Sequence, residues 1–256
     1  MKNFRCSLTI GACIAAIGLA FATTPAGALS DNDKTAVEAI IKDYLLNNPE
    51  VLRDALDVLE KRQAAEEITK QQAVIASHAK LIFDSPRGPL FGNPKGDVTL
   101  VEFFDYNCGY CKQAMSDVMQ LAKDDPKLKI VFKELPVLGP GSLEAAKVAI
   151  AVRMQDKNNK YVEFHRRLLG GRGEANKERA LAAARDAGFD LAQIEKDMKS
   201  SEVGETLKES ANLARALGVN GTPTFVIADE LITGAQGYDA MKGKIESARK
   251  CGKATC

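Results

Sequence analysis

The sequence predicts an α/β fold in which a β-α-β unit and a β-β-α unit are separated by a block of helices, with a further helical segment ahead of them. Three observations support this prediction. An apolar run at 98–104 is followed by a helical pattern and then by a second apolar run at 129–135. Helical periodicity dominates the stretch 139–218. Two short strand patterns at 225–228 and 231–233, joined by a turn, then precede a last helix.

The composition of the 256-residue chain is that of an ordinary globular protein, with 45% hydrophobic and 27% charged residues. The formal net charge is +1, and the chain has no run of lysine and arginine and no alternation of aromatic with basic residues. A basic surface of that kind is the usual sign of nucleic-acid binding. We therefore expect no nucleic acid among the partners.

The first 28 residues have the features of a secretory signal peptide. Lys2 and Arg5 form a positive start, residues 8–22 are nearly all apolar or small, and Ala26-Gly27-Ala28 is a cleavage pattern. An uncleaved membrane anchor is the alternative, although the apolar run is short for a spanning helix. Because Lys2 and Arg5 leave with this segment, the mature chain has a formal net charge of −1. No later apolar run is long enough to span a membrane, so we expect a soluble protein in the periplasm.

Four cysteines remain after export, and an oxidising compartment allows disulfides to persist. Cys251 and Cys256 lie close together near the end of the chain, where two unpaired thiols would be a hazard. We expect them to form a structural disulfide. The alternatives are a second redox relay from this tail and a zinc site made of all four thiolates, with Cys108 and Cys111.

Residues 29–84 are expected to form a helical N-terminal extension. Apolar residues recur at helical spacing on both sides of a break at 47–50, and residues 61–80 are rich in alanine, glutamine, glutamate and lysine. Such a helix has high propensity but too little apolar surface to form a core by itself. We expect residues 31–80 to act as an oligomerisation arm that packs on a partner chain. Packing on the globular domain of its own chain is the alternative.

Breakers at 85–97, Pro86, Pro89 and Pro94 among them, predict a linker, and the second domain is expected to span residues 85–256. Its helical insert is expected at about 139–218. The elements are predicted in this order: a strand at 98–104, a helix at 108–123, a strand at 129–135, helices at 142–154, 160–169, 177–187, 191–199 and 203–217, strands at 225–228 and 231–233, and a helix at 238–250.

The motif Cys108-Gly109-Tyr110-Cys111 lies between the strand at 98–104 and the helix that follows it. Cys108 is therefore expected at a helix N-terminus, where unpaired backbone N–H groups and the helix dipole favour a thiolate over a thiol. A thiolate attacks disulfides, and two cysteines at this spacing can close and reopen a small disulfide ring. The motif predicts redox chemistry that needs no cofactor beyond the Cys108–Cys111 disulfide and no metal.

This arrangement, together with Gly221-Thr222-Pro223 just before a strand, resembles the DsbA-like thiol:disulfide oxidoreductases of the thioredoxin superfamily. The N-terminal extension and residues 92–112 are most similar to the ScsC/Com1-type branch. The resemblance covers nearly all of the mature chain and implies a thioredoxin fold with a helical insert. It implies that Cys108 is the nucleophile and Cys111 the resolving thiol. Thr222 and Pro223 would form a cis-proline loop that faces the two cysteines and lines the substrate-binding groove.

The resemblance also assigns a catalytic role to Glu102, which lies six residues before Cys108. It matches the buried acid that is thought to assist proton transfer at the second cysteine. A solvated carboxylate at a strand edge is the alternative, because an ionised side chain in a central strand is costly. His165 is followed by two arginines and is expected at the surface. A hydrolase dyad of Cys108 with His165 is the alternative to that placement.

Gly109 and Tyr110, between the two thiols, are expected to contact substrate and to set the redox balance. DsbA itself has Pro-His at these positions and is a strong oxidant, whereas this chain has no imidazole in the ring to stabilise the Cys108 thiolate. We therefore expect a less oxidising couple, which favours a disulfide isomerase or reductase. A dithiol oxidase and a copper(I)-binding protein are the alternatives. The resemblance implies unfolded or misoxidised exported proteins as substrates, and a membrane redox partner that reduces or re-oxidises the pair.

Overall fold

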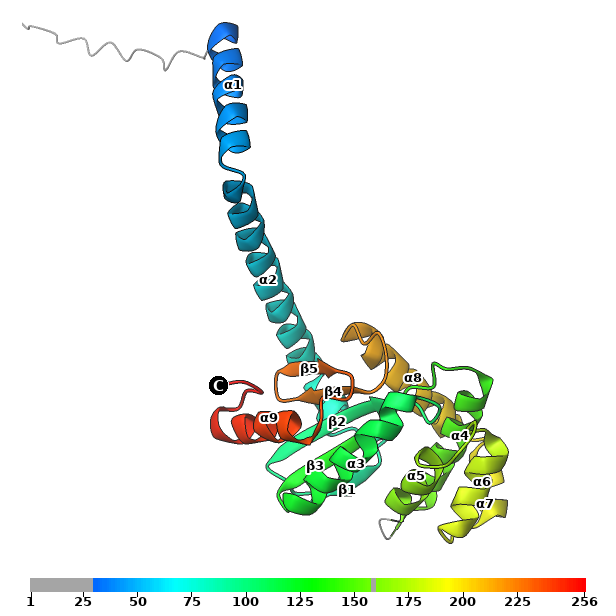
Figure 1. Cartoon of the computed structure of the whole chain (residues 1–256). Helices are drawn as coiled ribbons and strands as arrows, with labels where there is room; N and C mark the ends of the chain where they lie inside the picture. Colours follow the sequence, from blue (N-terminus) through cyan, green and yellow to red (C-terminus); the bar gives the residue numbers. More distant parts are fainter. Residues whose placement is uncertain (1–29, 158–159) are drawn as a thin grey trace, which may run out of the picture. The chain divides into compact units, whose positions relative to one another are not determined.

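The computed structural model describes residues 30–157 and 160–256 (Figure 1). The predicted signal peptide, residues 1–28, lies outside the described residues. By their internal contacts the residues fall into two units, which divide after Glu60. Within the described ranges, no helix is both long enough and apolar enough to cross a membrane.

The first unit contains helix α1, Asp31–Asn47, and the beginning of helix α2, Glu50–Phe83. Ser30 caps α1, because its hydroxyl accepts a hydrogen bond from the Asp33 backbone N–H while the Asp33 carboxylate accepts one from the Ser30 backbone N–H. No side chain of α1 is buried. The apolar side chains that recur at helical spacing in this segment are therefore exposed to solvent. The exposed large apolar residues of this unit are Val37, Ile40, Ile41, Tyr44, Leu46, Leu52, Leu56, Val58 and Leu59.

The second unit is built around a five-stranded sheet. Its strands are β1, Leu90–Gly92; β2, Val98–Phe104; β3, Leu128–Glu134; β4, Thr224–Ile227; and β5, Glu230–Thr233. In the order β1-β3-β2-β4-β5, strands β2 and β3 are parallel and every other neighbouring pair is antiparallel. Strand β2 is therefore central, and the loop that carries the CxxC motif leaves its C-terminal end.

Strand β1 lies inside the stretch 85–97 that the breakers marked as a linker. Phe91 pairs with Ile130 of β3, and Gly92 then adopts a φ of 76°, which glycine tolerates better than other residues. Three residues are too few to show the alternating pattern by which a strand is recognised. The sequence pattern therefore did not predict this edge strand.

The other helices described for this unit are α3, Gly109–Asp124; α4, Pro140–Gln155; α5, Tyr161–Leu169; α6, Lys177–Asp186; α7, Leu191–Asp197; α8, Ser201–Ala216; and α9, Tyr238–Cys251. Each helix predicted between 108 and 250 is confirmed, with ends that differ from the prediction by at most two residues. Helices α4 to α8, green to gold in Figure 1, are inserted between β3 and β4.

Alternate residues of the central strands face opposite sides of the sheet, and each side has its own core. On one side, Phe104 packs in a cluster with residues of α3, α5 and α9. On the other side, Phe103 packs with α8 and with the later half of α2, whose Ile75 and Ile82 are buried. We expected the domain boundary at 84/85, whereas the two units divide after Glu60, because the later half of α2 packs on the sheet. In the sequence, Ile75 and Ile82 are only sparse apolar points in a polar helix.

Charged groups hold the end of α2 to this second side of the sheet. Lys133 of β3 is buried, and its ammonium group donates to the Leu81 carbonyl oxygen at 2.8 Å and to the Glu209 carboxylate at 3.1 Å. Burial lowers the pKa of Lys133, and the contact with Glu209 opposes that shift. Arg87, in the loop after α2, forms ion pairs with Glu202 and Glu209 of α8 at 3.3 and 3.2 Å.

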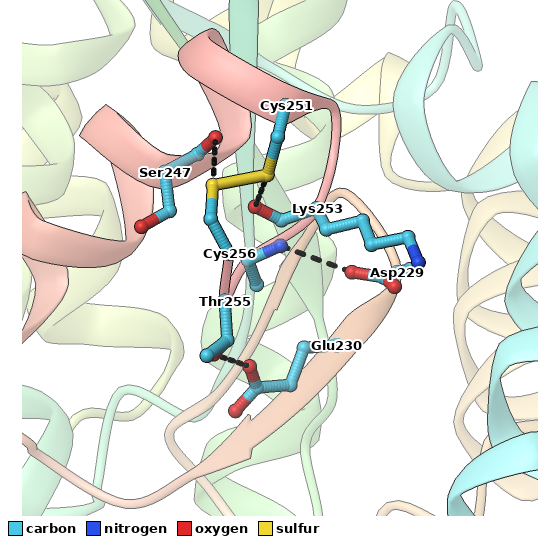
Figure 2. Close-up of a disulfide and its surroundings, with 8 residues drawn as sticks. Asp229, Glu230, Ser247, Cys251, Lys253, Thr255 and Cys256 are labelled. Carbon is cyan, nitrogen blue, oxygen red and sulfur yellow. Dashed lines mark hydrogen bonds between the residues drawn. A yellow bond between two sulfur atoms is a disulfide. The ribbon is translucent and has the colours of Figure 1, made fainter.

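Cys251, the last residue of α9, is joined to Cys256 by a disulfide (Figure 2). Figure 2 shows the closed tail beside Asp229 of the turn between β4 and β5. The Ala254 backbone N–H donates to the Asp229 carboxylate at 3.0 Å. Because Cys251 and Cys256 are bonded to each other, the four cysteines of the described residues do not form one metal site.

Candidate active site

The loop after β2 places Cys108 at the N-cap of α3. The Lys112 backbone N–H donates to the Cys108 carbonyl oxygen at 3.1 Å and closes the first helical turn. The N–H groups of that turn that have no helical partner, together with the helix dipole, stabilise an anion at this position. Cys108 is 6% exposed, so the surrounding residues cover most of it.

The Cys108 sulfur faces the loop that precedes β4. Its thiol donates to the Thr222 carbonyl oxygen at a distance of 3.0 Å, and the peptide bond between Thr222 and Pro223 is cis. The Pro223 carbonyl oxygen accepts from the Gly234 N–H at 2.8 Å, which ties the loop to the end of β5. The fold thus brings together the two motifs that the sequence places far apart, because β4 lies directly beside β2.

Cys111 lies one turn further along α3 and is completely buried. Both Cys108 and Cys111 are free thiols in this structure. Burial raises the pKa of the Cys111 thiol far above its ordinary value, and the nearby Glu102 carboxyl raises it further. Cys111 is therefore a protonated thiol that needs a base before it can attack a disulfide.

Glu102 is 1% exposed and lies in the centre of the sheet, paired with Phe132 on one side and Phe225 on the other. Burial raises its pKa to about 8, and the Cys108 sulfur contributes a smaller rise. Its Oε1 atom has no hydrogen-bond partner within the described part of the chain. The expected alternative, a solvated carboxylate at a strand edge, is excluded by this burial.

The two residues between the thiols are turned outward. Tyr110 is 67% exposed, and a side chain at Gly109 would meet no neighbouring atom within 4 Å. Neither residue donates a hydrogen bond to the Cys108 sulfur among the contacts of the described residues. Gly109 and Tyr110 are free to contact a bound protein, and they add no positive charge beside the thiols.

Sequence reasoning missed Asp105, which organises the loop. Its buried carboxylate accepts hydrogen bonds from the backbone N–H groups of Asn107, Val137 and Leu138, at 2.7, 2.8 and 3.0 Å. It also accepts from the Ser142 hydroxyl at 2.7 Å. One side chain therefore fixes the active-site loop against the start of the helical insert. The Asp-x-Asn pattern before the motif is a turn signal that could have indicated it.

His165 was expected at the surface, and this prediction was wrong. It is 1% exposed, and burial lowers its pKa to about 3. Its Nδ1 atom lies 3.3 Å from the Tyr106 hydroxyl, which lies 3.2 Å from the Tyr161 hydroxyl, and Tyr161 donates to Glu134 at 3.0 Å. The two arginines that follow His165 suggested an exposed helix, but the helix turns His165 toward the core.

Comparison with known proteins identifies the family. Residues 99–246, more than half of the chain, match the family described as a DSBA-like thioredoxin domain, and residues 33–66 match the N-terminal domain described as that of the copper resistance protein ScsC. The chain belongs to the DSBA-like thioredoxin family of thiol:disulfide oxidoreductases. The predicted fold class is confirmed: a thioredoxin fold with a helical insert and a helical N-terminal part.

Solved structures agree with this assignment. A thioredoxin-like oxidoreductase from Silicibacter pomeroyi is 44% identical, with a TM-score of 0.64, over 67% of this chain and 98% of that chain. The thiol-disulfide exchange protein alpha-DsbA2 from Wolbachia pipientis is 35% identical, with a TM-score of 0.66, over 70% and 96%. ScsC from Proteus mirabilis is 27% identical, with a TM-score of 0.64, over 87% and 98%. The last match extends into the N-terminal helices.

The chain spans about a quarter of the length of the first curated relatives that it matches. One of these is a Na⁺/H⁺ antiporter NhaA from Salinispora arenicola, 28% identical over 167 residues, which is 64% of this chain and 25% of that protein. The match therefore concerns only one part of the antiporter.

Proposed function

We propose that this chain is exported to the periplasm, where it acts on other exported proteins as a disulfide isomerase or reductase. The observation that carries the proposal is the position of the Cys108 sulfur, at the N-terminus of α3 and 3.0 Å from the carbonyl oxygen of Thr222 in the cis-proline loop. A helix N-terminus favours a thiolate over a thiol, and the sulfur at this one faces the cis-proline loop.

The reaction begins when the Cys108 thiolate attacks one sulfur of a client disulfide. A bond forms between Cys108 and that sulfur, the client S–S bond breaks, and the second client sulfur leaves as a thiolate. In isomerisation, another client thiolate then attacks the mixed disulfide and releases Cys108. In reduction, Cys111 transfers its proton to a base and attacks the Cys108 sulfur, so that a Cys108–Cys111 disulfide forms and the client leaves as a dithiol.

Glu102 is the base that this second step requires. The Glu102 carboxyl raises the pKa of the Cys111 thiol, and its own pKa of about 8 lies near the operating pH. A carboxyl group with such a pKa both accepts and returns a proton readily. We therefore assign Glu102 the role of proton acceptor for Cys111.

The burial of Cys111 supports isomerisation over simple oxidation. Because the pKa of this thiol is raised, little of it is thiolate, and resolution of the mixed disulfide is slow. A long-lived mixed disulfide gives the client time to rearrange. The absence of an imidazole at Gly109 and Tyr110 acts in the same direction, since nothing there stabilises the reduced form as strongly as in DsbA.

The first unit supports an oligomer. Residues 31–80 are proposed as the arm through which copies associate, and its exposed large apolar residues are concentrated before Glu60. Monomers rarely leave this much apolar surface uncovered. Several catalytic units held together would raise the effective concentration of thiols around one client.

The test is the recovery of activity from scrambled ribonuclease, with the chain reduced beforehand and its mass in solution measured by light scattering. An isomerase restores activity only when Cys108 is reduced. Replacing two exposed apolar residues of the arm, Ile40→Glu with Leu56→Glu, is expected to give monomers with lower isomerase activity. A matched control, Lys42→Gln with Asp57→Asn, changes charges on the same helices and leaves both properties unchanged. Full isomerase activity in monomers would contradict the role of the arm.

Two other functions are distinguished by the same preparations. A dithiol oxidase acts as a monomer on reduced substrates and is re-oxidised by a membrane quinone partner. Copper(I) binding by Cys108 and Cys111 is favoured by one observation, the match of residues 33–66 to a domain named after copper resistance. A copper protein would hold copper(I) against a competing chelator and show little turnover with ribonuclease.

A further inference from the structure

We infer that Asn107 is a positioning residue for the exchange reaction, through which a loop of the helical insert holds the Cys108 sulfur at the first turn of α3. This inference rests on the proposed function, because it concerns the same nucleophile. The loop, residues 170–176, lies between α5 and α6. It contacts the active-site segment at two places, one before Cys108 and one after it.

The contact before Cys108 is made by the Asn107 side chain. Its amide nitrogen donates to the Ala175 carbonyl oxygen at 2.9 Å, and its amide oxygen accepts from the Ala175 backbone N–H at 2.6 Å. The same nitrogen donates to the Ser142 hydroxyl at 2.9 Å, so both amide hydrogens and the amide oxygen have partners. Because Ala175 and Ser142 are buried, breaking these bonds would leave polar groups without water to replace them. The orientation of this side chain is therefore fixed.

The contact after Cys108 is made by Lys112, whose ammonium group donates to the Gly171 carbonyl oxygen at 3.1 Å. Lys112 belongs to the helical turn that Cys108 begins, since its backbone N–H donates to the Cys108 carbonyl oxygen at 3.1 Å. One loop of the insert therefore holds both the residue before the nucleophile and the turn after it. Such a loop restricts the rotation of the N-cap residue relative to the N–H groups of that turn.

The orientation of the N-cap matters because a helix stabilises an anion over a short distance only. The effect falls off within the first turn, and a charge-assisted hydrogen bond from N–H to sulfur needs a defined direction. Asp105 closes the turn before the nucleophile, since its carboxylate accepts from the Asn107 N–H at 2.7 Å and its carbonyl oxygen accepts from the Cys108 N–H at 3.1 Å. The Asn107 side chain joins this turn to the 170–176 loop. Without it, we expect a smaller fraction of Cys108 to be thiolate and its attack to be slower.

The experiment measures the attack of Cys108 on dithionitrobenzoate, a small aromatic disulfide, at neutral pH. The chain is purified after export and carries Cys111→Ser, which leaves Cys108 as the free thiol of the described residues. The Cys108 thiolate bonds to one sulfur, the S–S bond breaks, and the thionitrobenzoate that leaves gives the rate by its absorbance. The ultraviolet absorbance of the thiolate gives the ionised fraction of Cys108. In this background, Asn107→Ala and Asn107→Leu should each lower the rate about tenfold, together with the thiolate absorbance.

Two further substitutions separate positioning from a general loss of stability. Asn176→Ala is the matched control, because Asn176 lies in the same loop and caps α6 by accepting from the Arg179 N–H at 3.1 Å. Its loss is expected to lower the melting temperature and to leave the rate and the thiolate absorbance unchanged. Ser142→Ala removes one of the three hydrogen bonds of the Asn107 side chain, and we expect the rate to fall about twofold. Thermal unfolding of each variant shows whether it is folded.

The outcomes separate the two proposals. A folded Asn107 variant with the rate and thiolate absorbance of its parent overturns the inference and leaves the proposed function standing. An equal fall in Asn176→Ala also overturns the inference, because loosening of the loop alone would then explain the effect. If neither Asn107 variant folds, an unchanged rate in folded Ser142→Ala decides against it. If the parent reacts no faster than free glutathione, Cys108 is not an activated nucleophile, and the proposed function fails together with the inference.

Discussion

The described residues contain two pairs of cysteines, which lie at opposite ends of two helices. Cys108 begins α3 and Cys111 lies in its first turn, both buried and both free thiols. Cys251 ends α9 and is bonded to Cys256, and both are exposed. The comparison shows that a short spacing between cysteines does not by itself define a redox site.

The helix end accounts for much of the difference. A sulfur at the start of α3 faces unpaired N–H groups and the positive end of the helix dipole, which favour a thiolate. Cys251 occupies the negative end of α9, where the unpaired groups are carbonyl oxygens. Among the described residues, the Cys251 and Cys256 sulfurs contact the carbonyl oxygens of Lys253 and Ser247, and this pair has no buried acid such as Glu102 beside it. The first pair is therefore suited to exchange, and the second to staying closed.

The largest expected effect comes from removing one sulfur of the first pair. Cys108→Ser should lower the rate of disulfide exchange by on the order of 10³-fold or more, because the covalent nucleophile is lost. Cys111→Ser should instead retain the first attack and accumulate the mixed disulfide, since the resolving thiol is gone. Mass spectrometry of the reaction with a disulfide-containing protein distinguishes the two results. A Cys108→Ser variant that still exchanges disulfides at the original rate would refute the assignment of the nucleophile.

The second effect concerns the acid beside the first pair. Glu102→Gln should slow the resolution of the mixed disulfide roughly 10²-fold, the loss usual for a general base. In this variant the rate of resolution should also lose the dependence on pH that a group with a pKa of about 8 imposes. Quenched-flow measurement of mixed-disulfide decay between pH 6 and 9 would show this. Equal rates and pH profiles in the two proteins would mean that Cys111 gives its proton to another acceptor.

The same substitution should change the pH dependence of stability. The pKa of Glu102 is raised from 4.5 to about 8, so between these values the folded protein holds a proton that the unfolded chain has lost. The free energy of unfolding therefore falls as pH rises, by about 1.4 kcal/mol per pH unit from this one group. Denaturant unfolding should show a weaker fall in Glu102→Gln, whereas the exposed control Glu178→Gln should retain the fall of the original chain.

The sequence predicted the fold well where the signals were local. The order and ends of the helices between 108 and 250 follow from apolar periodicity and breakers, and the placement of Cys108 at a helix start follows from the strand and helix around it. Both kinds of signal act over a few neighbouring residues. The partnership of Cys108 with Thr222 came from the family resemblance, since no local pattern joins residues so far apart.

What the sequence did not predict depends on contacts between distant segments. Lys133 and His165 have polar or charged neighbours in the sequence, yet the sheet and the helices bury both. Asp105 gains its importance only when the loop at Val137 folds back onto it. The later half of α2 was expected to need a partner chain, but the face that contains Ile75 packs on its own sheet. Local propensity does not predict contacts between distant segments.

The smallest expected effect comes from the second pair. Replacing both cysteines, Cys251→Ser with Cys256→Ser, should lower the free energy of unfolding by about 2 kcal/mol, the loss of loop-closure entropy for a ring this short. We expect part of this loss of free energy to arise from contacts beside the disulfide ring. There the Asp229 carboxylate accepts from the Ala254 N–H of the tail at 3.0 Å and from the Gln72 side chain of α2 at 2.9 Å.

The rate of disulfide exchange should stay unchanged in this double variant, because the hydrogen bond described for the Cys108 sulfur goes to Thr222 and not to the tail. Denaturant unfolding and the exchange assay, run on the same preparation, measure the two quantities. A large fall in the exchange rate with little loss of stability would show that the tail relays electrons to the first pair. In that case the helix end would not decide which sulfurs react, and the contrast between α3 and α9 would have to be explained by access alone.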